Sequence, residues 1–162
     1  MTGEARIASA ADVSATCLAN ALRFGQSWLP EPANPWLLQH LFGKTSFVAL
    51  QDEGQAAGVI IAMLEHESRP LRLYVDQVAV DTAWRGHGLL GRLLEAAHHA
   101  GAARGAVEAW LTCHPDNPAL AAWPRYGYRQ VPAADQRNGW PVHRHFKGQD
   151  EDRVLFTKSL VG

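Results

Sequence analysis

The feature that most constrains this sequence is a glycine-rich turn between an apolar strand and a long helical segment. An alternating apolar strand ends near Val80, and helical periodicity begins near Gly88. Gly86, Gly88 and Gly91 fall within six residues, so successive backbone N–H groups can approach an anion without a Cβ in the way. The helix N-terminus adds unpaired donors and the positive end of its dipole. This arrangement predicts a site for a pyrophosphate group.

Two common phosphate-binding patterns do not fit this turn. No Lys-Ser/Thr pair follows the glycines, as the Walker pattern requires. The glycine spacing also differs from the dinucleotide-binding fingerprint, and the strands expected before the turn are antiparallel rather than parallel. The turn therefore indicates a phosphate site of a different kind.

The segments around the turn predict a mixed α/β arrangement. Period-two apolar stretches predict strands at 47–51, 56–64 and 71–80, which form an antiparallel meander. A helix over 88–104 and a strand over 107–113 then predict a parallel crossover. The other expected elements are a strand at 6–8, a helix that Asp12 caps and that runs to Phe24, a helix that starts at Pro35, a short helix at 117–123, strands at 128–131 and 153–160, and a long polar loop from Pro132 to Asp152.

Composition narrows the class of protein. A chain of 162 residues with 47% apolar and 19% charged residues is typical of one soluble globular domain, here expected to span 1–162. The formal net charge of −1 gives no field that would attract nucleic acid or anionic lipid. No apolar run reaches the ~18 residues of a membrane span, and the first residues do not resemble a signal peptide. Cys17 and Cys113 lie in apolar runs, so we expect no disulfide and a cytoplasmic protein.

The motif Arg85-Gly86-His87-Gly88-Leu89-Leu90 resembles the cofactor loop of the GNAT superfamily of N-acetyltransferases, which reads Arg/Gln-x-x-Gly-x-Gly/Ala. Arg85 and Gly88 match this loop, whereas Leu90 stands where a small residue is usual. Asn117 and the pair Gly127-Tyr128 continue the resemblance, which covers residues 72–131 well and the two ends of the chain by element order alone.

The resemblance implies a mixed, centrally splayed sheet of six or seven strands flanked by about four helices. It also implies that acetyl-CoA is the co-substrate, that an amine of a small molecule or peptide is acetylated by direct attack, and that a homodimer is compatible with the family. The residues that it assigns to acetyl-CoA are the backbone groups of Val78, Ala79 and Val80, the turn Arg85, Gly86, His87, Gly88, Leu89, Leu90 and Gly91, and Asn117.

The acid that would protonate the departing thiolate is where the sequence departs most from the family. The family often has a tyrosine four residues before the glycine that corresponds to Gly127, and this chain has Trp123 there. An indole N–H is no proton source for a thiolate. Tyr126 is the candidate acid among the nearest phenols, and another acid from the 132–152 loop or direct departure of the thiolate are alternatives.

The preferred general base is Asp76. In an alternating strand it shares a face with Tyr74 and Val78, and we expect that face to look toward the acetyl group. Its alternative roles are recognition of a cationic substrate or a bond to a neighbouring backbone group. His114, at the end of the strand over 107–113, is the second candidate base, and a solvated histidine is the alternative interpretation.

The acceptor site is expected in the least patterned segments, at about 25–36 and 132–150. Trp28, Trp36 and Trp140 fall there, where the family builds this site. The segment 143–145 (His-Arg-His) lacks further ligands at metal spacing, so it suits a substrate-gating loop or a dimer contact better than a metal site. Two alternative functions stay open: a domain that binds acyl-CoA without transferring the acyl group, and a transferase that uses a longer acyl-CoA.

Overall fold

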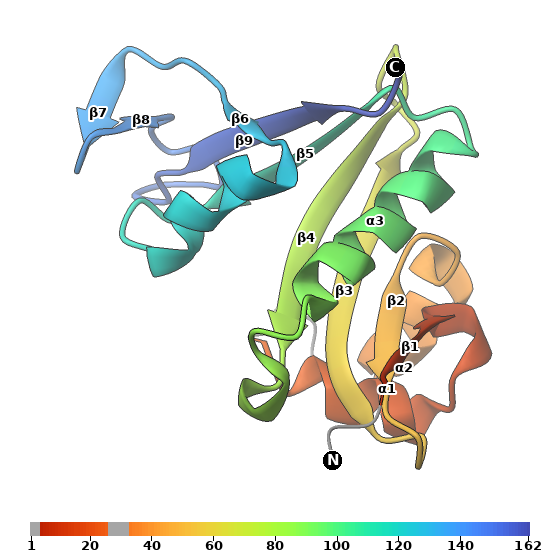
Figure 1. The fold of residues 1–162 in the computed structure, drawn as a ribbon. Coiled ribbons are helices and arrows are strands. Elements are labelled where there is room, and N and C mark those ends of the chain that lie inside the picture. The colour runs from red at the N-terminus through yellow and green to blue at the C-terminus, as the bar shows by residue number, and fades with distance from the viewer. Residues whose placement is uncertain (1–3, 26–32) are drawn as a thin grey trace.

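Residues 4–25 and 33–162 are described by the structure, which is a computed structural model. Figure 1 shows their arrangement as a central sheet with helices on both faces. In chain order the elements are β1 (Arg6–Ser9), η1 (Ala10–Asp12), α1 (Ala15–Leu22), α2 (Ala33–Leu37), η2 (Leu38–Phe42), β2 (Phe47–Leu50), β3 (Ala56–Glu65), β4 (Arg72–Val80), η3 (Thr82–Trp84), α3 (Leu89–Ala102), β5 (Glu108–Cys113), η4 (Pro118–Tyr126), β6 (Arg129–Gln130), β7 (Asp135–Arg137), β8 (Trp140–Val142) and β9 (Val154–Ser159).

The main sheet has seven strands in the order β1-β2-β3-β4-β5-β9-β6. Strands β1 to β4 form the predicted antiparallel meander. Strands β4 and β5, which α3 connects along the chain, pair in parallel. Strand β9 returns antiparallel to β5 and also pairs with the short β6. The expectation of a mixed sheet with six or seven strands is therefore confirmed, and the main sheet has seven.

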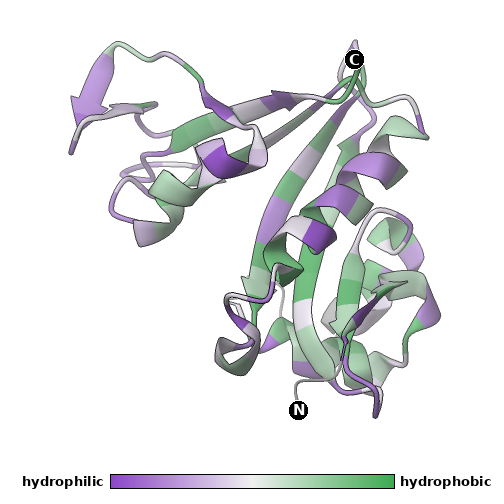
Figure 2. Ribbon diagram, viewed as in Figure 1, coloured by the Kyte–Doolittle hydropathy of each residue, from purple (hydrophilic) through white to green (hydrophobic). Residues whose placement is uncertain are grey.

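Two apolar clusters cover the two faces of the sheet. One joins α3 to inward residues of β2, β3, β4, β5 and β9, and the other joins α1 and the helices after it to the opposite face of β2 and β3. Figure 2 shows that apolar residues are concentrated in these central strands. Strand β3 is buried on both faces because helices cover both, which explains why it reads as a continuous apolar run.

Several predicted boundaries were wrong for identifiable reasons. Helix α1 is capped by Ser14, whose hydroxyl accepts a bond of 3.1 Å from the Cys17 N–H, whereas Asp12 lies in a separate 3-10 turn. Helix α2 begins at Ala33 and not at Pro35, because a proline in the first helical turn removes no hydrogen bond that the helix needs. The interval 132–152 is not all loop, since β7 and β8 form a hairpin there.

No helix among residues 4–25 and 33–162 is long and apolar enough to cross a membrane.

A buried polar pair links α3 to the end of η4. The hydroxyl of Tyr128 lies 2.6 Å from Nε2 of His98, and both residues are at least nine-tenths buried. Burial lowers the pKa of His98 to about 4, and the charge of Lys158 acts in the same direction. Burial also raises the pKa of Tyr128, so the phenol remains protonated and donates to a neutral imidazole.

We therefore expect the free energy of unfolding to fall as the pH drops from about 6.5 to about 4. In that window the unfolded chain protonates His98 while the folded chain resists it, so stability is lost by up to ~3 kcal/mol. Urea unfolding at a series of pH values measures the slope. His98→Gln should flatten it, whereas a matched substitution at the exposed neighbour, His99→Gln, should leave it in place. An unchanged slope in His98→Gln would show that other groups cause the pH dependence.

Candidate active site

Strands β4 and β5 pair along only part of their length. Parallel pairing joins Arg72–Val75 to Glu108–Leu111, whereas β4 continues to Val80 and β5 to Cys113. The strands therefore diverge at their carboxyl ends, as Figure 1 shows. A cavity of about 190 Å³ opens between them. It is lined by Val75, Asp76, Gln77, Val78, Leu111, Thr112, Cys113, Asn117, Ala119 and Trp123.

The edge of β4 beside this cavity presents backbone groups that face away from β3. The N–H of Asp81 donates to the carbonyl of Ala57 on β3 at 2.9 Å. This bond shows which residues of β4 direct their N–H groups toward β3. Because bonded and non-bonded pairs alternate in an antiparallel ladder, Ala79 pairs with β3 while Val78 and Val80 direct their N–H groups outward. β5 has already diverged at this level. Of the three predicted backbone donors, two thus face away from β3, and one of these, Val78, lines the cavity.

Two glycines of the turn have a left-handed backbone and open surroundings. Gly86 and Gly88 have positive φ values of 81° and 74°, and a Cβ at either position would meet no atom within 4 Å. Gly88 is the N-cap of α3, so the first N–H groups of the helix have no intrahelical acceptor. Leu90 packs against the apolar core and thus does not obstruct the turn. Arg85 and His87 are exposed on the same turn.

Gly91 and Asn117 lie in different surroundings: Asn117 lines the cavity between β4 and β5, whereas Gly91 lines a separate cavity along α3. Gly91 lies in the first turn of α3, where an added Cβ would lie 3.4 Å from the ring of Tyr126. Asn117 caps η4, because its side-chain oxygen accepts from the N–H of Ala119 at 2.8 Å. Its amide group lines the cavity.

Trp123 lies in the wall of the cavity, at the position where the family often has a tyrosine. Its indole N–H donates to Sγ of Cys113 at 3.1 Å, and its ring packs edge-on against Tyr128. Burial raises the pKa of the Cys113 thiol, with a smaller opposing effect from the Trp123 hydrogen bond. The indole N–H is thus directed to a sulfur of the protein itself, and the thiol is neutral at physiological pH.

Asp76 lies at a bulge in β4. Ile61 opposes Gln77 while Ala62 opposes Val75, so Asp76 is the extra residue on its strand. The bulge interrupts the alternation, and the prediction that Tyr74, Asp76 and Val78 share one face was wrong in part. Val78 packs against the cluster that contains α3, whereas Tyr74 and Asp76 both lie near Lys147 from the loop before β9.

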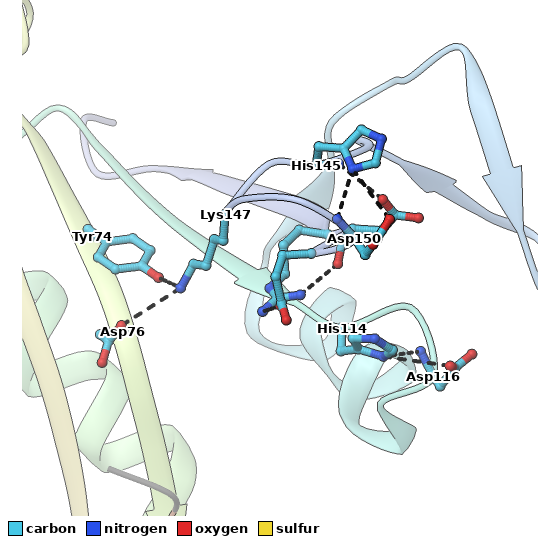
Figure 3. Close-up of polar contacts among 10 residues, drawn as sticks. Tyr74, Asp76, His114, Asp116, His145, Lys147 and Asp150 are labelled. Atoms are coloured by element: carbon cyan, nitrogen blue, oxygen red, sulfur yellow. Dashed lines mark hydrogen bonds and ion pairs between the residues drawn. The ribbon is translucent and has the colours of Figure 1, made fainter. Parts of the chain in front are cut away.

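The loop of residues 143–153, between β8 and β9, reaches this part of β4. Figure 3 shows the side chain of Lys147 extending from it toward Tyr74 and Asp76. Nζ of Lys147 donates to the Tyr74 hydroxyl at 2.6 Å and lies 4.0 Å from Oδ1 of Asp76. The carboxylate side chain is only 7% exposed, so this contact lies at a mostly desolvated group. An ammonium thus lies beside the predicted general base.

Two predicted catalytic residues lie away from this cavity. Tyr126 packs beside Gly91 and lines a separate cavity of about 710 Å³ along α3, together with Leu94, His98, Arg125 and Lys158. His114 is exposed, and its Nδ1 accepts from the backbone N–H of Asp116 at 3.3 Å. In Figure 3 the imidazole is directed toward Asp116 rather than toward Asp76.

Gln77 and Thr112 were not predicted to lie beside the cavity. Both line it, and the amide of Gln77 and the hydroxyl of Thr112 are buried without a hydrogen-bond partner among the described residues. Buried polar groups are normally paired, so the Thr112 hydroxyl suits a contact with a bound molecule, whereas the Gln77 amide lies against Gly25. Because side chains alternate along a strand, Thr112 was predictable from the sequence as lying on the same face of β5 as Trp110. The bulge that positions Gln77 leaves no such pattern in the sequence.

Aromatic side chains line the same face of β4 and β5 as Lys147. The rings of Tyr74 and Trp110 lie 4.6 Å apart, and Phe146 meets Trp110 edge-on at 6.2 Å. Of the tryptophans predicted near the acceptor site, Trp36 is 57% exposed on α2, and Trp140 packs against Phe156. Trp28 lies outside the described residues.

Comparison with known proteins identifies the family. Residues 16–128 match the model of the acetyltransferase (GNAT) family, so this chain belongs to that family of acetyltransferases. No curated protein sequence matches the chain.

Solved structures share the fold at low sequence identity. A chain of the NatC complex bound to Gag peptide and CoA has a TM-score of 0.71 at 17% identity, over 98% of this chain and 99% of that one. The ribosomal-protein-S18-alanine N-acetyltransferase from Escherichia coli has a TM-score of 0.67 at 19% identity, over 98% and 95%. Nourseothricin acetyltransferase has a TM-score of 0.56 at 23% identity, and the match covers 72% of this chain and 65% of that protein's length.

The environment of Cys113 leads to a testable expectation about its reactivity. Burial raises the pKa of both thiols, but Cys113 is only 7% exposed, whereas Cys17 is half-buried and has Arg6 nearby, which lowers its pKa. Because the reagent has less access to Cys113, iodoacetamide should alkylate it at least about tenfold more slowly than Cys17 near neutral pH. Peptide mass spectrometry over time measures both rates, and the two should become similar in urea. Faster labelling of Cys113 than of Cys17 in the folded protein would contradict the neutral, buried thiol.

Proposed function

We propose that this chain is an N-acetyltransferase that binds acetyl-CoA in the gap between β4 and β5. The observation that carries the proposal is the pair of outward N–H groups at Val78 and Val80, next to the open glycine turn that begins α3. The pantetheine arm of acetyl-CoA contains amide groups. These can form hydrogen bonds with the free edge of β4, as the backbone of a further strand would. The pyrophosphate then lies at Gly86–Gly91, and Asn117 supplies an amide donor from the η4 side.

The outward N–H of Val78 or Val80 polarises the thioester carbonyl in this proposal. A positioned donor of this kind lowers a barrier by about 3 kcal/mol. The acceptor amine approaches from the face of Tyr74 and Asp76, loses a proton to the Asp76 carboxylate, and attacks the acetyl carbon. The nitrogen–carbon bond forms and the carbon–sulfur bond breaks in one ternary complex, with no acyl-enzyme, because the Cys113 thiol is neutral and bonded to Trp123.

The thiolate departs without a tyrosine acid in this account. Tyr126 does not line the cavity, and the indole of Trp123 is directed to Cys113. The same observation favours the second candidate function, a domain that binds acetyl-CoA but does not transfer the acetyl group. A calorimetric titration of acetyl-CoA combined with a thiol-release assay separates the two. Binding with turnover supports the transferase. Binding without turnover on any amine supports the domain that binds acetyl-CoA and does not transfer the acetyl group.

The acceptor that we propose is a primary amine at the end of a peptide or on a small molecule. Structures that match nearly the whole chain include the NatC complex bound to a Gag peptide and CoA and a ribosomal-protein-S18-alanine N-acetyltransferase, and the shorter match is nourseothricin acetyltransferase. An aromatic wall from Tyr74, Trp110 and Phe146 lies beside the proposed amine position.

We further propose a cytoplasmic location, from the two free cysteines, and leave a homodimer as a prediction.

Substitution in the glycine turn should weaken acetyl-CoA binding selectively. Gly88→Ala places a Cβ where the pyrophosphate approaches the turn, so the affinity for acetyl-CoA should fall by at least about tenfold, which is about 1.4 kcal/mol. The strain of a left-handed alanine, about 1–2 kcal/mol, acts on folding and not on affinity. Gly139→Ala carries the same backbone strain, at φ 81° in the β7–β8 turn, and is the matched control. Calorimetry measures both. Equal affinities of the two variants for acetyl-CoA would show that the glycine turn is not part of the binding site.

Asp76→Asn should lower kcat/KM by about 10²–10⁴-fold, because a carboxamide cannot accept the amine proton. Its acetyl-CoA affinity should stay close to that of the unmodified chain. The control is Asp116→Asn, an exposed carboxylate that lies off the cavity and contacts His114 and Arg137. Thiol release at saturating acetyl-CoA gives the comparison. Full activity in Asp76→Asn would show that another group is the general base. A loss of activity in Asp116→Asn would support His114 as that base.

A further inference from the structure

The position of Lys147 resembles that of the acceptor amine in the proposed reaction. Its Nζ donates to the Tyr74 hydroxyl at 2.6 Å, lies 5.3 Å from the centre of the Tyr74 ring, and lies 4.0 Å from Oδ1 of Asp76. A hydroxyl, an aromatic face and a carboxylate together form a recognition site for an ammonium group. The chain's own lysine fills this site.

The loop that carries Lys147 is held in place by its own contacts. His143 and Arg153 exchange backbone bonds of 2.8 and 3.0 Å at its base, and the N–H of Lys147 donates to the carbonyl of Glu151 at 3.3 Å. Phe146 anchors the tip against Trp110 on β5. These contacts direct the lysine across the face of the sheet toward the diverging strands, as Figure 3 shows.

The other two lysines are placed differently. Lys158 donates to the carbonyl of Tyr126 at 2.8 Å and lines the cavity along α3. Lys44 is exposed after η2. Lys147 is thus the lysine that the fold brings to Asp76.

We propose that Lys147 is an acetyl acceptor in its own chain: the site transfers an acetyl group from acetyl-CoA to its Nζ. The inference rests on the proposed function. The ammonium first loses a proton to Asp76, Nζ bonds to the acetyl carbon, and the carbon–sulfur bond breaks. The thiolate takes up one proton, the second proton leaves to solvent, and the products are N-acetyl-lysine and coenzyme A. Acetylation removes the positive charge that ties the loop to Asp76 and frees the ammonium site for an external amine.

The direct test is peptide mass spectrometry of the full chain during incubation with acetyl-CoA and no added amine. We expect one acetyl group on Lys147, formed with a first-order rate constant that dilution of the protein does not change. Lys44 and Lys158 should stay at the slow rate that all three lysines show in the urea-unfolded chain. A rate that falls on dilution would overturn transfer within one chain, and equal slow labelling of the three lysines would overturn the site.

The same incubation separates this inference from the proposed function. Thiol release with an external amine, accompanied by an unmodified Lys147, would overturn the inference and leave the transferase standing. Failure to bind acetyl-CoA would overturn both.

A variant pair tests whether Lys147 holds the acceptor's place. Lys147→Arg keeps the charge and can keep the contacts to Tyr74 and Asp76, whereas Lys147→Gln removes the charge as acetylation does. We expect a KM for external amine severalfold lower in Lys147→Gln than in Lys147→Arg, with similar kcat. The same KM in both variants would mean that the lysine is only a tie between the loop and β4.

Discussion

The end of pairing between β4 and β5 is the constraint on which the rest of the structure depends. Once β5 leaves β4 after Val75 and Leu111, β4 has an edge with outward N–H groups and no neighbouring strand. The glycine turn that starts α3 comes soon after this strand, so the proposed phosphate site and the open backbone edge lie in sequence along one segment. Helix α3 packs against one face of β4, and α1 packs against the opposite face of the neighbouring strand β3.

Much of this arrangement could be predicted from the sequence because it has local causes. Periodicity located the meander and α3, and the glycines at 86 and 88 required a left-handed backbone, which the structure has. The β7–β8 hairpin was missed because its strands are only three residues long, so no alternation distinguishes them from loop. Ser14 and Asp12 are both good caps, and only packing selects between them.

The positions of the candidate catalytic residues were harder to predict because they depend on long-range geometry. A single extra residue at Asp76 turns Val78 to the α3 side while Tyr74 and Asp76 stay together near Lys147. Lys147 itself is 73 residues from Tyr74 in the chain. Tyr126 was predicted from its nearness in sequence to the family's tyrosine position, but the turn of η4 places its ring against α3. Trp123, the departure that the sequence revealed, does lie in the cavity wall.

The central claim is that acetyl-CoA binds along the open edge of β4, and an amide-resolved NMR titration tests it most directly. With isotope-labelled protein, the account predicts that acetyl-CoA shifts the amide signals of Val78 and Val80 and of the Gly86–Gly91 turn most strongly. The amide of Ala79, which is directed toward β3, should shift less. Shifts confined to the cavity beside Tyr126, His98 and Lys158, with Val78 and Val80 unchanged, would contradict the account.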